Sequence, residues 1–508
     1  MNQSPDAPSI AVPKDAAAMI LFCAPADPKL FWVKRSPRLT FQGGWYAYPG
    51  GQLEAGDYTV RVLNCEDGNT AAARVAAVRE VFEETGLLIA RGVEALTAAR
   101  LTELREELLA DCVSFADLLA RENLTIDAAM LTEAPRWVTP PSVPKRFNTF
   151  FFTAWVPDCQ DGAQQAQILP GELESGEWLR PSEAIERWRS GEILVAPPVL
   201  RPIQEMMRGL DGFVDRLRTA LETESPFPYE FRRGFMMCPL RAPTLPPATH
   251  TNCYIIGGEE LVVIDPGSPY PEEQQILDNV LEALLREGRR LREVIITHLH
   301  PDHIGGVNHL RDKFNVPVAA HRLTAEALAD SIPVDRFIED DELIELNGGE
   351  FDPDLTWRLR ALWSPGHARG HLSFYEERTG SLLTGDCILG IGTAVIAPPE
   401  GNMLDYLASL QRMKELPRLT ALFPAHGPAQ SQVQQIIDYY LAHRQERETK
   451  IVAALATEAR SIPELVKLIY TDVPLSRHQF AELSVQAHLE KLETEGRVAR
   501  QNERFTLN

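Results

Sequence analysis

The sequence predicts a multidomain protein in which α/β and α+β folds are combined. The chain has 508 residues, more than a single hydrophobic core usually organises. Strand-like and helix-like segments alternate in two long stretches, and a proline-rich segment at residues 197–250 separates them. Residues 445–508 have amphipathic helical patterns and close with two short strand-like runs. We therefore expect two larger domains and a small C-terminal one.

Composition and pattern also indicate where these parts begin and end. The polar N-terminus reads as loose chain, and the proline-rich segment reads as a helical piece followed by an extended connection. The expected segments are a flexible tail at 1–14, a first domain at 15–205, a linker at 206–234, a second domain at 235–430 and a helical C-terminal domain at 431–508.

The net charge of −22 bears on the partners of the protein. A strongly acidic chain repels nucleic acid at long range, so the charge disfavours a nucleic-acid partner unless a local basic groove compensates. No apolar run reaches the roughly 20 residues that a bilayer requires, and the N-terminus lacks a signal-peptide pattern. We expect a small-molecule substrate, no membrane partner and a cytoplasmic location.

The seven cysteines support a reducing compartment. They are scattered, odd in number and form no CxxC pair, which is not typical of a disulfide framework or a zinc site. We expect reduced, buried thiols.

The first stretch has the elements of a mixed sheet with helices. Glycine-rich turns at 42–44 and 49–51 interrupt its early part, and Gly86 is well placed to end a helix. The expected elements are strands at 19–23 and 30–33, a helix at 71–85, a strand at 149–156 and a helix at 181–189.

An acidic helix face is the chemical signal of this stretch. Glu80, Glu83 and Glu84 at positions i, i+3 and i+4 share one face, where like charges repel unless a cation binds between them. Such a cluster suits Mg²⁺ or Mn²⁺, which in turn holds a diphosphate. Gly50 and Gly51 allow the backbone to approach a ligand. A solvated acidic surface is the structural alternative.

Arg79-Glu80-x-x-Glu83-Glu84-x-Gly86 resembles the core of the Nudix motif, with two departures. Asp57 stands where the pattern has glutamate, and the spacer at 58–78 is much longer than usual. A long spacer is similar to that of the peroxisomal CoA-type Nudix diphosphatases. The segments 33–36, 137–140, 146–151 and 176–181 resemble that branch as well.

The Nudix resemblance, over about residues 15–205, implies an α/β/α sandwich and a CoA or other nucleoside-diphosphate substrate. It also implies roles for particular residues. Glu80, Glu83 and Glu84 would be metal ligands for Mg²⁺ or Mn²⁺. Arg35, Gly50 and Gly51 would bind the ligand, and Glu83 and the late acid Glu174 would be catalytic.

The second stretch alternates strands and helices, as α/β layers do. The expected elements are strands at 253–257 and 261–265, a helix at 272–287 and a strand at 294–297.

A dense metal-ligand pattern follows the last of these strands. His298, His300, Asp302 and His303 fall within six residues, so one loop can present ligands to two adjacent metals. His367, Asp386 and His426 each follow an apolar segment beside glycine or proline, where a tight turn can aim a side chain inward. Imidazole and carboxylate together suit zinc, iron or manganese. Any one of these histidines could be a satisfied core residue, but the array as a whole predicts a metal site.

This array resembles the metallo-β-lactamase fold superfamily over about residues 235–430, which implies an αββα sandwich. The resemblance implies that His298, His300 and His367 hold one metal, that Asp302, His303 and His426 hold a second, and that Asp386 bridges. Two Zn²⁺, or iron or manganese, would then activate water and polarise the substrate, with Asp302 also a catalytic candidate. Asp265 resembles the acid that supports the ligand loop.

The flanks narrow the resemblance. Residues 251–257 resemble the opening strand of the glyoxalase II-like and lactamase-like branches. His443-Arg444-x-x-Arg447-Glu448, followed by a winged-helix-like tail, resembles the mitochondrial lactamase-like single-strand endoribonucleases and their bacterial relatives. Winged helices often bind nucleic acid, but this tail mixes acids with bases, which favours a packing or dimerisation element that closes over the active-site cleft.

The sequence thus suggests a bifunctional metal-dependent hydrolase. One site would cleave the diphosphate of CoA or of a nucleoside-diphosphate derivative, and the other would hydrolyse an ester or a thioester such as acyl-CoA. The alternative is a non-catalytic nucleotide sensor in the first domain and a single-strand endoribonuclease in the second.

Overall fold

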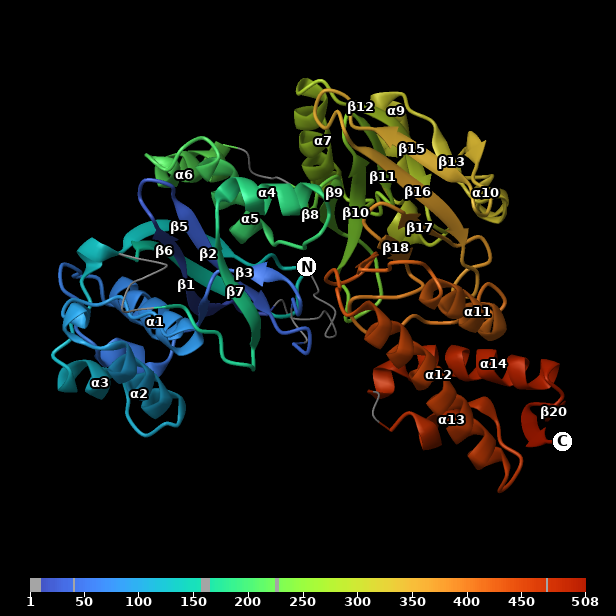
Figure 1. Cartoon of the computed structure of the whole chain (residues 1–508). Coiled ribbons are helices and arrows are strands. Elements are labelled where there is room, and N and C mark those ends of the chain that lie inside the picture. Colours follow the sequence, from blue (N-terminus) through green and yellow to red (C-terminus); the bar gives the residue numbers. More distant parts are fainter. Residues whose placement is uncertain (1–10, 40–41, 157–164, 224–227, 472–473) are drawn as a thin grey trace. The chain divides into compact units, whose positions relative to one another are not determined.

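The computed structural model describes residues 11–39, 42–156, 165–223, 228–471 and 474–508 (Figure 1). The chain divides into two compact units, Ser9–Arg233 and Gly234–Asn508. Each unit is described by itself.

A mixed sheet organises the first unit. Its strands run in the order β3-β2-β1-β6-β5, with β4 paired to β1 and β7 to β2, and β1 runs parallel to β6. The strands are β1 (Lys14–Cys23), β2 (Lys29–Arg35), β3 (Tyr46–Ala47), β4 (Gly50–Gln52), β5 (Thr132–Val138), β6 (Phe147–Trp155) and β7 (Leu173–Leu179).

Helices cover both faces of this sheet, which confirms the predicted α/β/α sandwich. Successive side chains of β1 alternate between the faces. Met19 and Leu21 pack against α1, whereas Ile20 and Phe22 pack against α4 and α5. The helices of the unit are α1 (Gly68–Thr85), α2 (Ala98–Leu109), α3 (Phe115–Arg121), α4 (Pro181–Arg189), α5 (Pro197–Met206) and α6 (Phe213–Thr223).

The long spacer at 58–78 largely lengthens the motif helix. A 3-10 turn at Ala55–Thr59 precedes it, and α1 begins already at Gly68, where the Asp67 side chain accepts a hydrogen bond from the Thr70 N–H. Gly86 ends the helix with φ of 78°, the left-handed conformation that favours glycine. The extra residues therefore leave the acidic segment at the end of a single regular helix.

The segment at 206–234 differs from the predicted linker. Its proline content suggested extended chain, but Phe213 and Val214 begin an amphipathic helix, α6, that joins the apolar cluster of α5. β8 (Tyr229–Arg232) follows, and the first unit ends at Arg233. Of the tail expected at 1–14, residues 1–10 lie outside the described residues, and β1 begins at Lys14.

Two sheets face each other in the second unit. The first has the order β14-β13-β12-β11-β10-β9, and the second has the order β15-β16-β17-β18-β19. Phe235 of β9 and Phe423 of β19 stack between them with ring centroids 5.0 Å apart. The strands of the first sheet are β9 (Phe235–Arg241), β10 (His250–Gly257), β11 (Glu260–Ile264), β12 (Arg290–Ile296), β13 (Val318–Ala320) and β14 (Arg336–Phe337). Those of the second are β15 (Leu343–Asn347), β16 (Thr356–Trp363), β17 (Leu372–Glu376), β18 (Ser381–Gly385) and β19 (Ala421–Pro424).

Helices cover the outer face of each sheet, which completes the predicted αββα sandwich. α7 and α9 pack on the first sheet, and α11 and α12 pack on the second. The helices are α7 (Pro271–Arg286), α8 (Pro301–Ile304), α9 (Val307–Phe314), α10 (Arg322–Leu328), α11 (Met403–Lys414) and α12 (Val433–Leu455).

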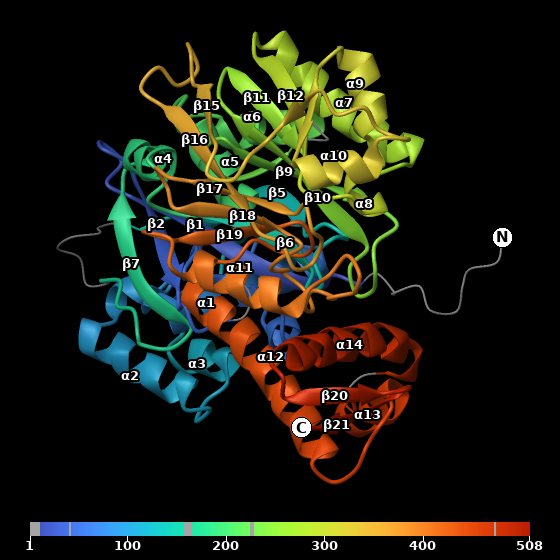
Figure 2. The same ribbon diagram turned by 90° about the vertical axis from the view of Figure 1, so that its right-hand side faces the viewer.

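Helix α12 belongs to two cores at once. Val433, Ile437 and Tyr440 at its start pack against α11, whereas Ile451 and Leu455 at its end pack in the C-terminal core. Figure 2 shows α12 extending from α11 to this C-terminal part. The remaining elements are α13 (Ile462–Ile469), α14 (His478–Thr494), β20 (Val498–Gln501) and β21 (Arg504–Leu507), the predicted order of helices and hairpin.

The cysteines agree only in part with the expectation of reduced, buried thiols. Cys238, Cys253 and Cys387 are free and buried, and Cys65 and Cys112 are free but reach solvent. Cys23 is half of a disulfide, which corrects the prediction for that residue. Spacing along the chain carries no information on which strand edges a fold brings together, so the sequence could not indicate this bond.

Within the described residues, no helix combines the length and the apolar character needed to cross a membrane.

Candidate active sites

The ligand-type residues of the second unit gather at one end of its strands. The loop after β12 and the short helix α8 supply His298, His300, Asp302 and His303. The others follow β16, β18 and β19, namely His367, Asp386 and His426. The residues form three overlapping groups, each with ligand atoms within 4.8 Å of one another. The fold thus brings together residues that are nearly 130 positions apart in the sequence, from His298 to His426, as predicted.

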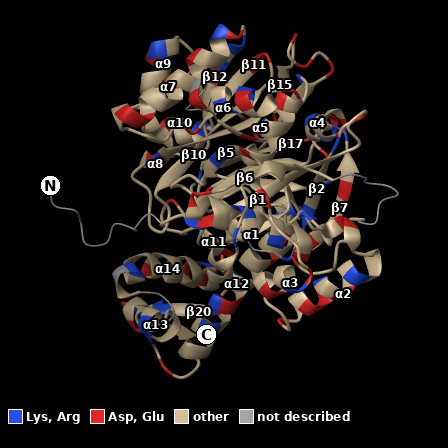
Figure 3. Ribbon diagram, turned by 90° about the vertical axis from the view of Figure 1, so that its left-hand side faces the viewer, with Lys and Arg blue, Asp and Glu red and all other residues tan. Residues whose placement is uncertain are grey.

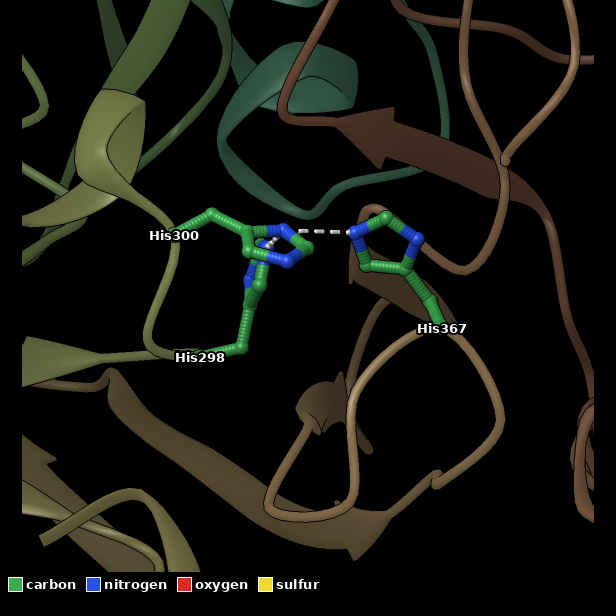
Figure 4. A group of neighbouring side chains, drawn as sticks. All are labelled: His298, His300 and His367. Carbon is green, nitrogen blue, oxygen red and sulfur yellow. Dashed lines mark hydrogen bonds between the residues drawn. The ribbon is translucent and has the colours of Figure 1, made fainter. Parts of the chain in front are cut away.

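Three imidazoles make the first group (Figure 4). His298 Nε2 and His367 Nε2 lie 2.9 and 3.0 Å from His300 Nδ1. His367 Nδ1 donates to the Val395 carbonyl at 2.8 Å, so His367 Nε2 presents a lone pair. Lone pairs that converge on one point repel each other unless a cation lies between them.

Carboxylates join imidazoles in the other groups. His426 Nε2 lies 3.3 Å from both Asp302 Oδ2 and Asp386 Oδ1. His303 Nε2 is 3.5 Å from Asp386 Oδ1, and His367 Nε2 is 3.5 Å from Asp386 Oδ2. Asp386 therefore stands between the two sets of histidines, where a bridging ligand would be needed.

Asp265 holds the loop at 297–303 in place through hydrogen bonds. It is buried, and its φ of 54° turns the chain sharply at the end of β11. Its carboxylate accepts hydrogen bonds from the Thr297 N–H (2.8 Å) and hydroxyl (2.7 Å), and contacts His303 Nδ1 at 2.8 Å. This orients His303 with Nε2 toward the cluster, as the resemblance implied.

Two features show that the cluster fits divalent metal ions. His303 Nε2 and Asp386 Oδ1 are buried and have no hydrogen-bond partner among the described residues, as expected of atoms that coordinate a cation. Burial and neighbouring imidazoles lower the pKa of His300 to about 4 and that of His298 far below its usual value. These rings are therefore neutral at pH 7, which is the form that binds metal.

In the groups that contain carboxylates, the neighbouring charges favour the ionised forms of both the imidazole and the carboxylate. Burial alone would lower the pKa of His426, but the carboxylates of Asp386 and Asp302 outweigh it and raise that pKa to about 10. The imidazoles of His303 and His426 lower the pKa of Asp302 to about 2, against the effect of its own burial. Without a cation, the two carboxylates therefore hold a proton on His426, and a bound metal ion would take the place of that proton.

His371 is a buried residue of this site that the sequence did not single out. Its Nε2 accepts a hydrogen bond from the Asp386 N–H at 3.0 Å, and its Nδ1 lies 2.9 Å from the Ser364 hydroxyl. Burial lowers its pKa to about 3, so it stays neutral and positions Asp386. Its place at the start of β17, four residues after His367, was the available signal.

The cluster opens into a cavity of about 660 Å³. His300, Asp302 and His426 line it on one side, and Phe480 and Leu483 of α14 line it on another. The C-terminal helices therefore help to form the active-site cleft, which agrees with the predicted packing role of the tail.

Helix α12 also holds the segment at 389–394, which follows Asp386 in the chain. Tyr440 accepts a hydrogen bond from the Leu389 N–H (2.9 Å) and donates to the Gly392 carbonyl (3.1 Å). Arg444, one turn further along, donates to the Ala394 carbonyl, next to the residue that anchors His367. Arg444 belongs to the motif that resembles the endoribonuclease branch, and Tyr440 lies just before it. The contacts of both residues described here are structural.

In the first unit, Arg79 is the centre of the acidic helix end. It pairs with Asp57 through Nε and Nη2 at 2.9 and 3.1 Å. Its Nη1 contacts Glu80 at 3.0 Å and Glu83 at 3.1 Å. Asp57 thus holds Arg79, which explains why a shorter acid is accommodated at the position where the pattern has glutamate.

Gly50 and Gly51 bring β4 against this helix end. The Gly50 N–H donates to Glu84 Oε2 at 3.0 Å, and a Cβ on Gly51 would lie 2.3 Å from Glu80 Oε1. Burial and neighbouring carboxylates raise the pKa of Glu84 to about 8, and burial raises that of Glu80 to about 7. The cluster is difficult to ionise fully without a cation.

Glu174, the late acid to which the resemblance gives a catalytic role, has a different partner from these carboxylates. It forms an ion pair with Lys34 at 2.8 Å and does not line the cavity of the acidic helix. Glu172 lines that cavity instead. The pairing of β7 with β2 shifts by one residue at Glu174, which forms a bulge. Because of this bulge, the Glu174 side chain does not point to the same side of the strand as the side chain of Glu172. A bulge leaves no mark in the sequence that could have been read.

The cavity beside the acidic helix has a volume of about 700 Å³ and contains the predicted ligand-binding residues. Arg35, Gly50 and Gly51 line it together with Glu80, Glu83 and Glu84. Arg35 Nε is buried and has no hydrogen-bond partner among the described residues, and Lys145 adds a second positive charge. Positive and negative groups thus face the same space, as a metal-bound anion requires.

We expect Asp57→Asn to destabilise the first unit by about 3 kcal/mol, at the lower end of the effect of removing one partner of a buried ion pair. Asp57 is 2% exposed, and Arg79 would keep Glu80 and Glu83 as charged partners and the Gln52 carbonyl as a neutral one. Chemical denaturation followed by fluorescence measures the change. Asp27→Asn, which removes the exposed Asp27–Arg180 pair, is the matched control and should leave the midpoint unchanged.

A sandwich of two sheets that gathers imidazoles and carboxylates at one end of its strands defines a class of metal-dependent hydrolases. Comparison with protein families agrees. Residues 246–426 match the metallo-beta-lactamase superfamily, residues 64–206 match the NUDT19 Nudix domain, and residues 461–505 match the beta-lactamase associated winged helix domain.

Curated relatives match just under half of the chain. The beta-lactamase-like protein 2 homolog of Caenorhabditis elegans is 28% identical over 254 residues, which are 49% of this chain and 80% of the relative. The lactamase-like protein vrtG of Penicillium aethiopicum is 30% identical over 236 residues, 44% of this chain and 69% of the relative. The atrochrysone carboxyl ACP thioesterase of Aspergillus fumigatus is 28% identical over 238 residues, with coverages of 44% and 69%.

The chain belongs to the metallo-beta-lactamase superfamily. It is a hydrolase in which a Nudix domain, a metallo-β-lactamase domain and a winged helix are fused, as the sequence predicted.

Proposed function

We propose that the second unit hydrolyses thioesters, with acyl-CoA as the leading substrate. The observation that carries this proposal is the largely apolar cavity lined by part of the histidine and aspartate cluster described above, here called the metal-type cluster (His298, His300, Asp302, His303, His367, Asp386 and His426). A thioester needs a polarised carbonyl and space for its acyl and carrier groups. The similarity to a relative named as an acyl-carrier thioesterase supports the same chemistry.

In this proposal His298, His300 and His367 would hold one metal, Asp302, His303 and His426 would hold a second, and Asp386 would contribute to both. Bound metal ions supply Lewis acidity and an activated water. Water oxygen forms the new bond to the acyl carbon, the C–S bond breaks, and the thiol leaves with a proton. Asp302 has a second carboxylate oxygen besides the one 3.3 Å from His426, and it is the candidate to hold and pass that proton.

Two properties of the C-terminal helices weigh against RNA as the substrate. Helix α13 carries Glu464 and Lys467, and α14 carries three glutamates against the single Lys491, so neither helix presents a positive stripe (Figure 3). Arg444, one of two arginines that line the cavity, is buried and donates to the Ala394 carbonyl. Binding of a single strand usually draws on a positive groove with exposed aromatic side chains.

For the first unit we propose a diphosphatase that acts on CoA or another nucleoside-diphosphate derivative. Glu80, Glu83 and Glu84 would bind Mg²⁺ or Mn²⁺, and Arg35 would contact the diphosphate. Their shared cavity and the raised pKa values of the buried acids support a bound divalent cation.

A nucleotide sensor is the second candidate for the first unit, and one observation favours it. Among the described residues, the three glutamates do not form a compact ligand group, because Arg79 occupies Glu80 and Glu83. Binding of CoA in the presence of Mg²⁺ or Mn²⁺, without cleavage under any divalent cation, would establish the sensor.

We expect the unaltered protein to hydrolyse acyl-CoA thioesters and to leave unstructured RNA intact. The test compares kcat/KM for acetyl-CoA and longer acyl-CoAs with cleavage of a labelled RNA, each repeated with Asp302→Ala. Thioester turnover that disappears in Asp302→Ala supports the proposal. RNA cleavage that disappears in that variant, with no thioester turnover in the unaltered protein, would overturn it in favour of an endoribonuclease.

A further inference from the structure

Helix α14 presents two different apolar faces. Val485, Leu489 and Leu492 pack in the C-terminal core. Phe480 and Leu483, three residues apart and therefore neighbours on the helix surface, are only half-buried, lie outside that core and line the cavity of the metal-type cluster. A helix needs one apolar face for its own fold, so the second face requires a separate explanation.

The other walls of this cavity are apolar as well. Leu245, Pro246 and Pro247 lie in the connection between β9 and β10, and Ile391 and Val395 lie in or directly after the segment that α12 holds. Leu245 is 46% exposed although it lines the cavity, so part of this apolar wall faces solvent in the absence of a ligand. Apolar surface left in contact with water marks a place where an apolar group binds.

We propose that Phe480 and Leu483 form one wall of an acyl-binding chamber, and that the second unit selects thioesters by the length of an uncharged aliphatic acyl group. This inference rests on the proposed thioesterase function and names its substrate class. The metal-type cluster lines the same cavity, so a carbonyl held at His300 and Asp302 has its acyl chain inside the chamber.

The chamber has the charge expected for such a ligand. Apart from the cluster, its charged lining residues are Glu400, Arg444 and Arg477, with His443 as a titratable neighbour. The buried Arg444 already donates to the Ala394 carbonyl, and the remaining acid and base offset each other. An acyl group that ends in a carboxylate would gain little there and would lose its hydration.

The expected signature is a dependence of kcat/KM on acyl length. From acetyl-CoA through butyryl-CoA and hexanoyl-CoA to octanoyl-CoA, kcat/KM should rise by about fourfold per buried methylene until the chamber is full. Leu483→Trp fills the chamber and should shift the preference to shorter chains. Phe480→Ala enlarges it and should extend the preference to longer ones.

Leu468→Trp is the matched control. Leu468 is an apolar residue of α13, 52% exposed and not among the cavity residues, so the same substitution there should leave the length profile unchanged. Thermal unfolding of each variant confirms that it is folded. Binding of octanoate, measured by calorimetry on the metal-loaded protein, gives a readout that needs no turnover, and Leu483→Trp should weaken it.

The outcomes separate this inference from the proposed function. Thioester turnover with a flat length profile in all variants overturns the chamber and leaves the thioesterase in place. If no thioester is turned over, the proposed function fails, and octanoate binding decides the chamber: binding that Leu483→Trp weakens supports it, and its absence from the unaltered protein overturns it.

Discussion

Replacing His298 with alanine is expected to lower the rate of the second unit by roughly a thousandfold, the kinetic equivalent of the several kcal/mol that a Lewis-acid metal supplies. His298 is fully buried, and its Nε2 lies 2.9 Å from His300 Nδ1 within the three-imidazole group. The substitution removes a proposed neutral ligand, and the group then has two imidazoles instead of three. Metal content, measured by mass spectrometry on protein purified without chelator, should fall together with kcat.

His309→Ala is the matched control for this experiment. His309 lies on α9, is one-third exposed and contacts Asp278 rather than the cluster. It should keep the metal content and the activity of the unaltered protein. Full activity and full metal content in His298→Ala would contradict the assignment of His298 as a ligand, and so would unaltered protein that contains a single ion or none.

Replacing Glu83 with glutamine is expected to reduce diphosphate cleavage by about two to three orders of magnitude while the first unit stays folded. Glutamine has the same shape, and its amide oxygen can still accept the hydrogen bond that Arg79 donates to Glu83 at 3.1 Å. Only the charge that would bind Mg²⁺ or Mn²⁺ is lost. Release of the nucleotide product from CoA, measured by chromatography in the presence of each ion, gives the rate.

Glu172 and Glu174 give an internal comparison for the same reaction. Glu172 lines the cavity of the acidic helix, whereas Glu174 pairs with Lys34. Glu172→Gln should therefore slow cleavage, and Glu174→Gln should not. The opposite result would restore the role that the Nudix resemblance implied for Glu174. Equal activity of Glu83→Gln and the unaltered protein would refute a metal-binding role for the helix.

The cluster of the second unit could be predicted from the sequence because its residues lie in short, recognisable segments of the chain. Four of its residues lie within six positions after a strand, and His367, Asp386 and His426 each follow a strand end beside glycine or proline. Strand ends of one sheet system meet at one edge, so the fold brings such residues together. The layers of both sandwiches followed from the same alternation of strands and helices.

Other features depend on contacts that the sequence does not encode locally. The bulge at Glu174 changes which acid faces the cavity, and only the pairing of β7 with β2 reveals it. The helix α6 was hidden by prolines around it. His371 acts through the backbone of Asp386, fifteen residues away, so its role appears only when β17 and β18 are paired.

The residues proposed for the chemistry of the second unit and those proposed for its selectivity come from separate stretches of the chain. The residues gathered around the proposed metals end at His426, whereas the wall formed by Phe480 and Leu483 comes from a helix that begins at His478. Changes in α14 can therefore alter which substrates are accepted while the reacting groups stay as they are. Engineering of the substrate range would therefore begin at α14, away from the reacting groups.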